Sequence, residues 1–433
     1  MKPYPAYRDS GLLWPGKVPQ HWQIKRLKYV APMSRAKLAE KPADLPYLGL
    51  EHIESRTGQL LLDNPVEDVE STVSLFEKGD VLFGKLRPYL AKVALAEGRG
   101  VCTTELLVFQ PGKMIDSKFL FYRLLAQDFI DFANSMTYGA KMPRASSEQI
   151  INAVISFPAL SEQKVITQFL DHKLSEIDDF IRNKSKLITL LNEQKTIITH
   201  NAVTRGINPR VRLKPSGVRW LGEIPEHWEV KRARYYFREI DERSAAGDEE
   251  LLSVSHITGV TPRSEKNVTM FMAESYEGYK LCQPSDLVIN IMWAWMGALG
   301  VSQHRGIVSS SYGVYRQKQK FFHWRYLDYL LRLKPYIAEF TARSTGIHSS
   351  RLRMYTEDFF DIPIIRPPLD EQERIVCTIE QEHAAIDLAI SAAGREIALI
   401  KEFRMALVSD VITGKMDVRT IHPAYYNQIT LTL

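Results

Sequence analysis

A run of mostly apolar side chains, spaced alternately four and three residues apart, extends from position 170 to position 202 and recurs from 379 to 411. Adding 209 to each position of the first run gives the second, without insertion or deletion. This 3.5-residue period is typical of a coiled-coil seam. Because loops tolerate length changes and packed helices do not, the constant spacing predicts two equivalent long helices. Each would hold roughly 40 residues and extend about 60 Å at about 1.5 Å per residue.

Polar residues interrupt this predicted seam at Lys184, Lys195, His383 and Arg404. Their stems could reach along the helices to solvent, or their polar ends could fix the register of one helix against the other; we favour the second interpretation. The apolar seam positions are Leu170, Leu174, Ile177, Ile181, Ile188, Leu191, Ile198, Ile379, Ile386, Ile390, Ile397, Ile400 and Leu407.

The helical repeat is part of a larger duplication with a period of about 206 residues, too long for a solenoid repeat. Residues 10–26 read SGLLWPGKVPQHWQIKR and residues 216–232 read SGVRWLGEIPEHWEVKR, with nine of seventeen positions identical. Glycine and proline punctuate both stretches, which favours a turn anchored by two tryptophans. A structural anchor is a better interpretation of this opening motif than a binding site.

Composition restricts the function only weakly. The formal net charge of +5 and the pI near 8.8 permit a polyanionic partner without requiring one. Cys102, Cys282 and Cys377 lie far apart, which argues against a disulfide or zinc framework. No apolar run is long enough to cross a bilayer, so we expect a soluble cytoplasmic protein without a membrane partner.

Each repeat shows the same order of short elements between the opening motif and the long helix. Strands are predicted at 47–53 and 80–83 in the first repeat and at 251–257 and 286–289 in the second, with a His-Ile pair in the earlier strand of each. Amphipathic helices are expected at 119–133 and 324–340, followed by glycine-containing loops at 137–144 and 344–353. A last strand is expected at 155–158 and at 362–365.

The long helices carry matching signals at both ends. Leu160-Ser161-Glu162-Gln163 and Leu369-Asp370-Glu371-Gln372 predict a Ser or Asp cap followed by an acidic first turn. Asp370 and Glu373 have the spacing of a capping box, which Lys164 weakens in the first repeat. Gly206 and Gly414 predict the ends.

These features together resemble the specificity (S) subunit of Type I restriction-modification systems over nearly the full length. The resemblance rests on the Ser-Gly-x-x-Trp-x-Gly-x-x-Pro-x-His-Trp motif, the shared helix starts and glycine stops, and the stretch Asn290-Ile291-Met292-Trp293-Ala294-Trp295-Met296-Gly297-Ala298. It implies an α+β fold in which two target recognition domains are separated by two long antiparallel coiled-coil helices with a pseudo-twofold repeat. The domains would be 1–159 and 209–368, the helices 160–208 and 369–420, and the tail 421–433.

The resemblance also implies partners. Each recognition domain would read one half of a split double-stranded DNA site, and the helices would set the spacing and dock two methyltransferase (modification) subunits. Restriction and motor subunits would join through the complex. The chain itself would be non-catalytic and hold no cofactor or metal, because S-adenosylmethionine, ATP and magnesium would bind the partner subunits.

Loops that mix Arg or Lys with amide, hydroxyl and aromatic groups are the expected DNA contacts. The equivalent Arg144 and Arg351 are candidates for phosphate contacts, since both halves must be positioned on the backbone. Lys85 and Arg87 are candidates for reading guanine, because the second repeat has Ile291 and Trp293 there. Trp293 and Trp295 would share one face of a strand, and packing in the core is an equally good interpretation. The predicted DNA-binding residues are Lys85, Arg87, Tyr89, Tyr138, Lys141, Arg144, Trp293, Trp295, Ser344, His348, Arg351 and Arg353.

Two other functions stay open at this stage. One is a duplicated helical scaffold that binds proteins and has no DNA specificity. The other is a single-chain restriction enzyme, but the sequence lacks a Walker or dinucleotide loop, an Asn-Pro-Pro-aromatic methyltransferase motif and a metal-type His or Cys cluster.

Overall fold

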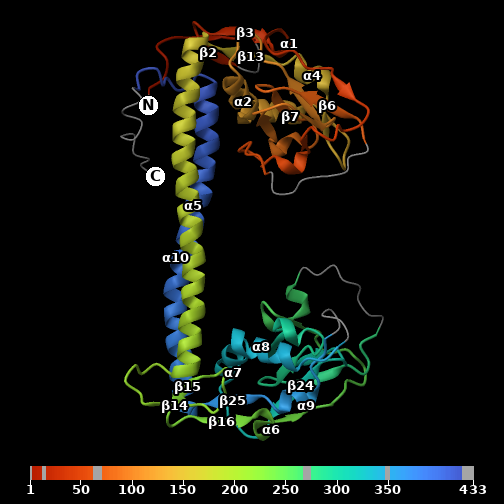
Figure 1. Ribbon diagram of the computed structural model, residues 1–433, viewed down its shortest axis with the longest axis vertical. Coiled ribbons are helices and arrows are strands. Elements are labelled where there is room, and N and C mark those ends of the chain that lie inside the picture. The colour runs from red at the N-terminus through yellow and green to blue at the C-terminus, as the bar shows by residue number, and fades with distance from the viewer. Residues whose placement is uncertain (1, 12–15, 62–70, 267–274, 347–351, 422–433) are drawn as a thin grey trace. The chain divides into compact units, whose positions relative to one another are not determined.

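The computed structural model describes residues 2–11, 16–61, 71–266, 275–346 and 352–421. The chain divides into two compact units, one comprising residues 1–186 with 393–433 and the other residues 187–392. Unit 1 and unit 2 each combine the globular part of one repeat with segments of both long helices (Figure 1).

The globular part of unit 1 is a set of small sheets packed with short helices. A four-stranded sheet has the order β4-β6-β9-β5 and a three-stranded sheet the order β10-β7-β8; β1-β2, β3-β13 and β11-β12 are pairs, and only β5-β9 is parallel among them. The strands are β1 Tyr7–Asp9, β2 Lys17–Pro19, β3 Gln23–Arg26, β4 Lys37–Leu38, β5 Tyr47–Leu48, β6 Val73–Phe76, β7 Val81–Gly84, β8 Val93–Leu95, β9 Gly100–Thr103, β10 Leu106–Phe109, β11 Thr137–Tyr138, β12 Arg144–Ala145 and β13 Val154–Phe157. The helices are α1 Leu27–Val30, α2 Ser117–Leu125, α3 Gln127–Ser135 and α4 Ser147–Ile151, with 3-10 turns η1 Leu50–His52 and η2 Pro88–Leu90.

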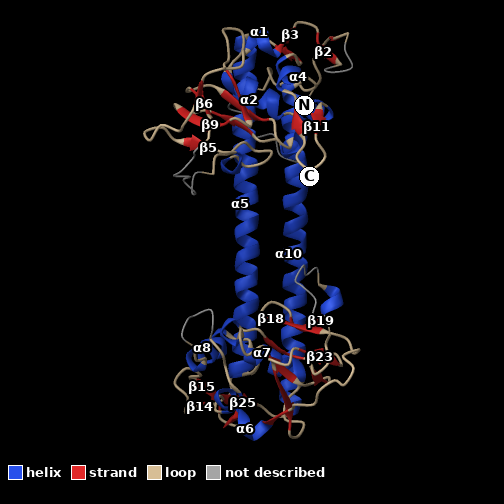
Figure 2. Ribbon diagram, turned by 90° about the vertical axis from the view of Figure 1, so that its right-hand side faces the viewer, coloured by secondary structure: helices blue, strands red, loops and turns tan. Residues whose placement is uncertain are grey.

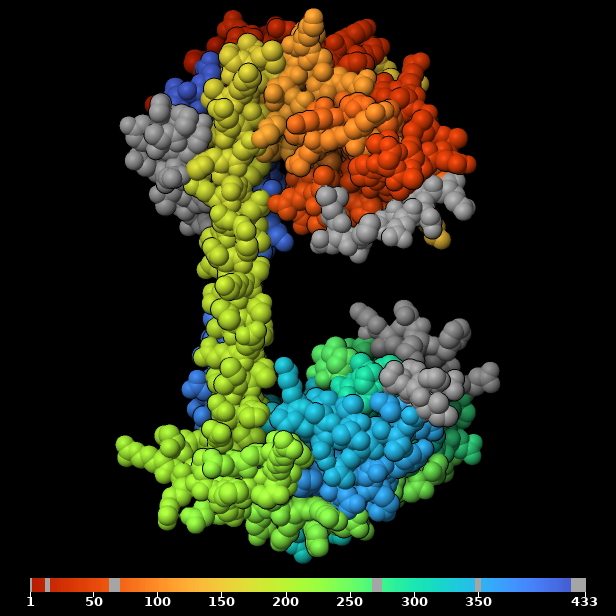
Figure 3. Space-filling view, in the orientation of Figure 1, coloured from red at the N-terminus to blue at the C-terminus, as the bar shows by residue number. Residues whose placement is uncertain are grey.

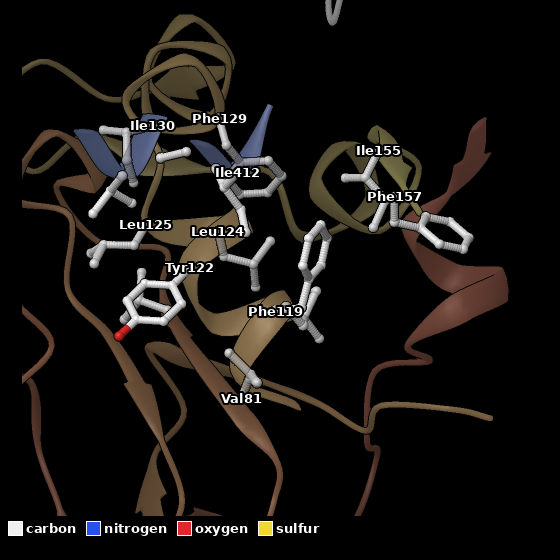
Figure 4. Packing of buried hydrophobic residues seen from close by; sticks show 14 of the residues in the cluster. Val81, Phe119, Tyr122, Leu124, Leu125, Phe129, Ile130, Ile155, Phe157 and Ile412 are labelled. Atoms are coloured by element: carbon white, nitrogen blue, oxygen red, sulfur yellow. The ribbon is translucent and has the colours of Figure 1, made fainter. Parts of the chain in front are cut away.

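The main core of unit 1 lies between α2, α3 and the sheets and extends onto the long helices. Figure 4 shows Phe119, Leu124 and Phe129 directed into it, together with Ile412 from the second long helix. The end of one repeat's helix thus completes the core of the other repeat's globular part.

Unit 2 also consists of small sheets packed with short helices, but its strands pair in a different order. Its largest sheet has the order β17-β24-β21-β22, and the pairs are β14-β15, β16-β25, β18-β19 and β20-β23 (Figure 2). The strands are β14 Leu213–Pro215, β15 Glu223–Pro225, β16 Glu229–Arg232, β17 Phe237–Glu239, β18 Leu252–Ser255, β19 Gly259–Pro262, β20 Lys280–Cys282, β21 Leu287–Ile289, β22 Leu299–Val301, β23 Gly306–Val308, β24 Gly313–Gln317 and β25 Pro363–Arg366. The helices are α6 Ala233–Tyr236, α7 Trp324–Leu331, α8 Lys334–Arg343 and α9 Thr356–Phe360, with 3-10 turns η3 Arg263–Glu265 and η4 Ala294–Met296.

The long helices are α5, Leu160–Arg205, and α10, Leu369–Ile412. They pack antiparallel in each unit. Among the predicted seam residues, Leu170, Leu174, Ile177, Ile379, Ile386, Ile400 and Leu407 are buried, and Ile181, Ile188, Leu191, Ile198, Ile390 and Ile397 are half-buried.

Polar seam residues form interhelical ion pairs in both units. Arg404 pairs with Asp178 in unit 1, and the equivalent Lys195 pairs with Asp387 at 2.6 Å in unit 2. Lys184 Nζ also lies 2.5 Å from Glu396 Oε2. Each pair joins one position of α5 to one position of α10, as expected if polar seam residues fix the register.

The opening motif and the start of each long helix form one joint. Glu162 Oε1 accepts a hydrogen bond from the Trp22 indole at 3.0 Å, and His21 Nε2 lies 2.9 Å from the other carboxylate oxygen. In unit 2, Glu371 Oε2 accepts from the Trp228 indole at 3.1 Å, and His227 Nε2 lies 2.7 Å from it. Trp22 and Trp228 are each only 1% exposed. The motif is therefore a structural anchor, while Trp14 lies outside the described residues.

The glutamine after each of these glutamates is buried, and both its amide nitrogen and its amide oxygen form hydrogen bonds. Gln163 Nε2 donates to the carbonyls of Pro158 at 2.8 Å and Met114 at 3.0 Å, and its Oε1 accepts from Asp116 N at 2.8 Å. Gln372 makes the equivalent set with Pro367 O, Phe321 O and His323 N. The Glu-Gln pair thus ties each helix start to its globular part.

The predicted helix caps are wrong. Because α5 begins at Leu160 and α10 at Leu369, Ser161 and Asp370 lie within the first turn, and Asp370 pairs with Arg374 at 3.0 Å. The predicted glycine ends are confirmed. Gly206 directly follows α5, Gly414 lies two residues beyond α10, and their φ angles are +76° and +77°. The helices therefore end before the predicted boundaries at 208 and 420.

Each predicted amphipathic helix is in fact two helices. The first breaks at Ala126 and the second between Leu331 and Lys334, where Ala126 and Leu333 are extended. Pro335 explains the second break, because a proline is tolerated in the first turn of α8 but not inside a longer helix.

The placement of the His-Ile pairs in strands is also wrong for His52, His256 and Ile257, while Ile53 forms an isolated bridge with Leu60. His52 ends η1 and donates no ladder hydrogen bond; its Nδ1 accepts from Gly49 N at 2.9 Å. His256 and Ile257 follow β18 in a turn, and their carbonyls accept from Arg332 at 2.7 and 2.6 Å. The two pairs thus have unlike roles.

Candidate nucleic-acid interface

The structure brings the two predicted DNA-binding loops of unit 1 together. Ala145 N donates to Lys85 O at 2.8 Å, and Arg87 N donates to Pro143 O at 2.7 Å. The loop after β7 and the β11-β12 hairpin therefore form one continuous surface, which we call surface A (residues 85–90 and 137–145).

Surface A exposes cations and aromatic rings. Arg87 and Lys141 are exposed, Lys85 is half-buried, and Tyr89 and Tyr138 are 43% and 63% exposed. Arg87 has a φ of +49° and is followed by Pro88, which starts η2. This backbone fixes the base of the Arg87 side chain while its guanidinium extends to solvent.

Arg144 is less available than the other cations of surface A. Its Nε lies 3.2 Å from both carboxylate oxygens of Glu105. No ion pair within the described part of the chain involves Lys85, Arg87 or Lys141. The net positive charge of surface A therefore comes chiefly from these three residues, because Glu105 offsets the charge of Arg144.

Unit 2 joins the equivalent loops by one of these two hydrogen bonds, because Trp293 N donates to Asn290 O at 3.0 Å and not across to the other loop as Arg87 N does. Met354 N donates to Ile291 O at 3.0 Å, as Ala145 N does to Lys85 O, and Thr345 and Arg353 exchange backbone hydrogen bonds at 2.9 Å. We call the resulting surface B (residues 290–297, 344–346 and 352–355). His348 and Arg351 lie outside the described residues.

Trp293 directly precedes the turn η4 and Trp295 lies in it, so the prediction that the two tryptophans share a face of a strand is wrong. Trp293 is 51% exposed, whereas Trp295 is half-buried and donates its indole N–H to Met292 O at 3.0 Å. Thr341 Oγ1 donates to Trp295 O at 3.1 Å, which anchors the turn on α8. Trp295 is thus a packing residue and Trp293 a surface residue.

Ser344 must be removed from the predicted contacts. It is 8% exposed, and its hydroxyl donates to Phe340 O at 2.7 Å at the end of α8. Its side chain is therefore buried at the helix end and is not exposed on surface B. Arg353 is exposed at the base of the same loop.

Two exposed apolar side chains of surface B are not among the predicted contacts. Tyr355 is 52% and Met296 37% exposed, and both belong to segments joined by the Met354–Ile291 hydrogen bond. A search for loops containing Arg or Lys could not select them. Their signal is the comparison of repeats, because Ser146 and Leu90 stand at the equivalent positions.

Surfaces A and B share the hydrogen bond that joins their loops, but they differ in chemistry and in backbone conformation at the equivalent Arg87 and Trp293, whose φ angles are +49° and −128°. Surface A offers a guanidinium and two ammonium groups beside two tyrosines, which suits phosphates and guanine edges. Surface B offers Trp293, Tyr355 and Met296, which suit apolar or stacking contacts. Among the described residues no group of three or more His, Cys, Asp or Glu could hold a metal ion, and no helix is long and apolar enough to cross a membrane.

Comparison with known proteins gives the family that the chain resembles. Residues 19–190 match the family described as the Type I restriction modification DNA specificity domain. The chain is 26% identical to the putative type I restriction enzyme MjaX specificity subunit of Methanocaldococcus jannaschii, over 94% of this chain and 96% of that protein. It is 23% identical to the MjaVIII specificity subunit of the same organism, over 94% and 95% of the two chains. The EcoDI specificity subunit of Escherichia coli is 27% identical over 44% of each chain.

Two solved structures share the fold. One is a chain from a study of complex assembly and conformational transition of the type I R-M system, with a TM-score of 0.64, 18% identity, and coverage of 93% of this chain and 100% of that chain. The other is the HsdS subunit from Thermoanaerobacter tengcongensis, with a TM-score of 0.51, 20% identity, and coverage of 93% and 99%.

Proposed function

Since the chain belongs to the specificity-subunit family of Type I restriction-modification systems, we propose that surface A and surface B read the two halves of a bipartite DNA site. The chain is the DNA sequence-recognition subunit of its system. In this proposal it catalyses nothing itself. Methyl transfer and cleavage, with S-adenosylmethionine, ATP and magnesium, belong to partner subunits.

One observation carries this proposal: loop frames joined by an equivalent hydrogen bond present different side chains. The hydrogen bonds from Ala145 to Lys85 and from Met354 to Ile291 build the frames, while Arg87 and Trp293 occupy equivalent exposed positions. An arginine can bind guanine O6 and N7 together, and an indole cannot. The two surfaces therefore recognise unlike half-sites, and the complete site is asymmetric.

The long helices are the proposed docking site for two modification subunits. Leu190 and Leu399 occupy equivalent positions outside the seam and are 50% and 55% exposed. Figure 3 shows a long face of α5 that no other segment covers. Exposed leucines repeated in both halves fit two copies of one partner, and restriction and motor subunits would join through this complex.

The helices are also the proposed spacer between the half-sites. Four residues inserted into this region add about 6 Å of helical rise, which is roughly two base pairs at about 3.4 Å each. Unchanged separation of the half-sites in such a variant would contradict the spacer role.

The direct test is selection of duplexes from a random DNA library by the chain assembled with its modification subunit, repeated over a series of salt concentrations. We expect one motif with two unlike half-sites and a steep fall of affinity with salt. A protein-binding scaffold without DNA specificity would instead give weak, sequence-blind binding at every salt concentration. Methylation or cleavage of DNA by the isolated chain would contradict the non-catalytic role.

A further inference from the structure

Each unit exposes a tyrosine at the same position. Tyr29 on α1 is 63% exposed and Tyr235 on α6 is 61% exposed, and they are 206 residues apart, the period of the duplication. Each follows three basic positions, Lys25-Arg26-Leu27-Lys28 in the first repeat and Lys231-Arg232-Ala233-Arg234 in the second. Packing does not account for either ring, since both are mostly in water.

The backbone next to each tyrosine is held by the same hydrogen bond and the same strand pair. Leu27 N donates to Ala153 O at 2.8 Å, and Ala233 N donates to Ile362 O at 2.8 Å. Leu27 and Ala233 are fully buried. Strand β3 pairs with β13 and β16 with β25 directly before these short helices. Both tyrosines therefore project from a fixed backbone position, which lowers the entropic cost of binding.

The charges around the two tyrosines are not alike. Lys28 Nζ lies 5.2 Å above the Tyr29 ring, and no ion pair in the described part of the chain involves Lys25, Arg26 or Lys28. In unit 2, Arg234 and Arg232 both contact Asp361 Oδ1, at 2.6 and 3.2 Å. Carboxylates of the same unit thus already neutralise the second site. What the two sites share is an exposed tyrosine beside a cation.

This combination identifies the kind of partner. A base-reading surface should differ between the repeats, as Arg87 and Trp293 do. A phosphate-binding surface should keep its positive charge in both, and unit 2 does not. A protein that binds once to each unit needs the same anchor twice, and tyrosine and arginine are enriched among the residues that dominate protein interfaces.

We propose that Tyr29 and Tyr235 are equivalent anchors for the modification subunit, one copy on each unit, in addition to its contact with the long helices. This inference rests on the proposed function. The complementary face of the partner is an apolar pocket for the ring, and a carboxylate beside that pocket meets an unpaired cation, Lys28, in unit 1, whereas Arg234 in unit 2 is already paired with Asp361. Because only the first site carries unpaired cations, docking there should be the more salt-sensitive of the two.

The test compares the full-length chain with Tyr29→Ala, Tyr235→Ala and the double variant. Native mass spectrometry counts the modification subunits bound per chain, and titration gives the affinity. We expect each single variant to weaken one of two binding events by about tenfold or more, and the double variant to weaken both. Tyr138→Ala, at the 63% exposed tyrosine of surface A, is the matched control and should leave assembly unchanged.

A second measurement does not depend on removing a side chain. The photo-cross-linker p-benzoylphenylalanine placed at position 29 or 235 should capture the modification subunit, while the same group at position 138 should capture DNA. Thermal melting of each variant verifies that the fold is intact.

The outcomes separate this inference from the proposed function. A wild-type chain that binds two modification subunits, with tyrosine variants that bind them equally well, would overturn the inference alone. Variants that keep both subunits but lose DNA affinity as Tyr138→Ala does would assign the surface to DNA and overturn it too. A wild-type chain that recruits no modification subunit would overturn the proposed function and, with it, this inference.

Discussion

The joint between each long helix and its globular part is the same in the two units, whereas the side chains on surface A and surface B differ. Glu162 and Glu371 accept from equivalent tryptophans, and Gln163 and Gln372 make the same three hydrogen bonds. By contrast, an arginine on surface A is replaced by a tryptophan on surface B. The two repeats therefore share the residues that join each long helix to its globular part, and they differ in the side chains exposed on surfaces A and B.

The comparison predicts its largest effect at the glutamine joint. Gln163→Ala and Gln372→Ala should each reduce the stability of the respective unit by about 3 kcal/mol, because one buried and two partly buried backbone groups lose their partner. Urea unfolding followed by tryptophan fluorescence would measure both losses. The control is Glu357→Ala, which removes a side chain that is 82% exposed. It should change the stability of unit 2 little. A large loss in one unit only would show that the joints are not equivalent.

A pair of equivalent aspartates should respond to the same mutation with opposite sign. Asp80 and Asp286 each accept a backbone N–H from three residues earlier, at 2.9 Å. Asp286 also binds the Arg316 guanidinium at 2.8 and 2.9 Å, whereas Gln110 replaces that arginine in unit 1. Asp286→Asn should cost about 2 kcal/mol, and Asp80→Asn should stabilise unit 1 by roughly 1 kcal/mol at neutral pH.

The pH dependence at Asp80 follows from its burial, which raises the pKa of this carboxyl. The folded state therefore holds the proton more tightly than the unfolded state does. The stability of unit 1 should be highest below the unfolded pKa and fall as pH rises through the raised folded pKa. Melting curves between pH 3.5 and 7 should show this fall in the wild type and not in Asp80→Asn. A parallel fall in both proteins would contradict the assignment.

One layer of the helix seam is polar in unit 2 and apolar in unit 1. His383 Nε2 lies 3.1 Å from Thr199 Oγ1 and 3.2 Å from Lys195 O, with Asp387 and the Tyr329 ring nearby. The equivalents of His383 and Thr199 in unit 1 are Leu174 and Val408, both buried.

Burial lowers the pKa of His383, so the folded state favours the neutral ring. The contribution of the neutral His383 ring to the stability of unit 2 is complete above the pKa of the unfolded state. It is lost as pH falls through the lowered pKa of the folded state. We therefore expect unit 2 to lose stability as pH falls from 7.5 to 5.5. The double variant Thr199→Val/His383→Leu copies the apolar layer and should remove this loss. Thermal melting at the two pH values measures this loss of stability. The same loss in the double variant would contradict its assignment to His383.

The smallest expected effect concerns one turn. Gly79 and Ser285 precede the equivalent aspartates and have φ angles of +91° and +73°. A left-handed conformation costs a residue with a side chain roughly 1–2 kcal/mol in the folded state. Glycine avoids this cost but loses more backbone entropy on folding, which offsets part of the advantage. Gly79→Ser should therefore destabilise unit 1 by about 1 kcal/mol, and Ser285→Gly should stabilise unit 2 by less than that. Equal signs for the two exchanges would contradict the comparison.

The sequence predicted features that depend on period and repetition, and missed those that depend on local backbone geometry. The seam and the glycine ends at Gly206 and Gly414 follow from spacing and residue type alone. The break before α8 required giving Pro335 more weight than the amphipathic pattern. The placement of Trp293 and Trp295 depended on a 3-10 turn that an apolar run does not signal. Tyr29 and Tyr235 could have been found by extending the repeat alignment three residues past Arg26 and Arg232.

The central claim is that each unit reads its own half of one DNA site. Its most direct test is methylome sequencing of a cell that carries the modification subunit with either the wild-type chain or Arg87→Ala. The wild type should give one motif with two unlike half-sites at a constant separation. Arg87→Ala should relax or weaken one half-site and leave the other half-site and the separation unchanged. A change in both half-sites, or a wild-type motif without two separate halves, would contradict the claim.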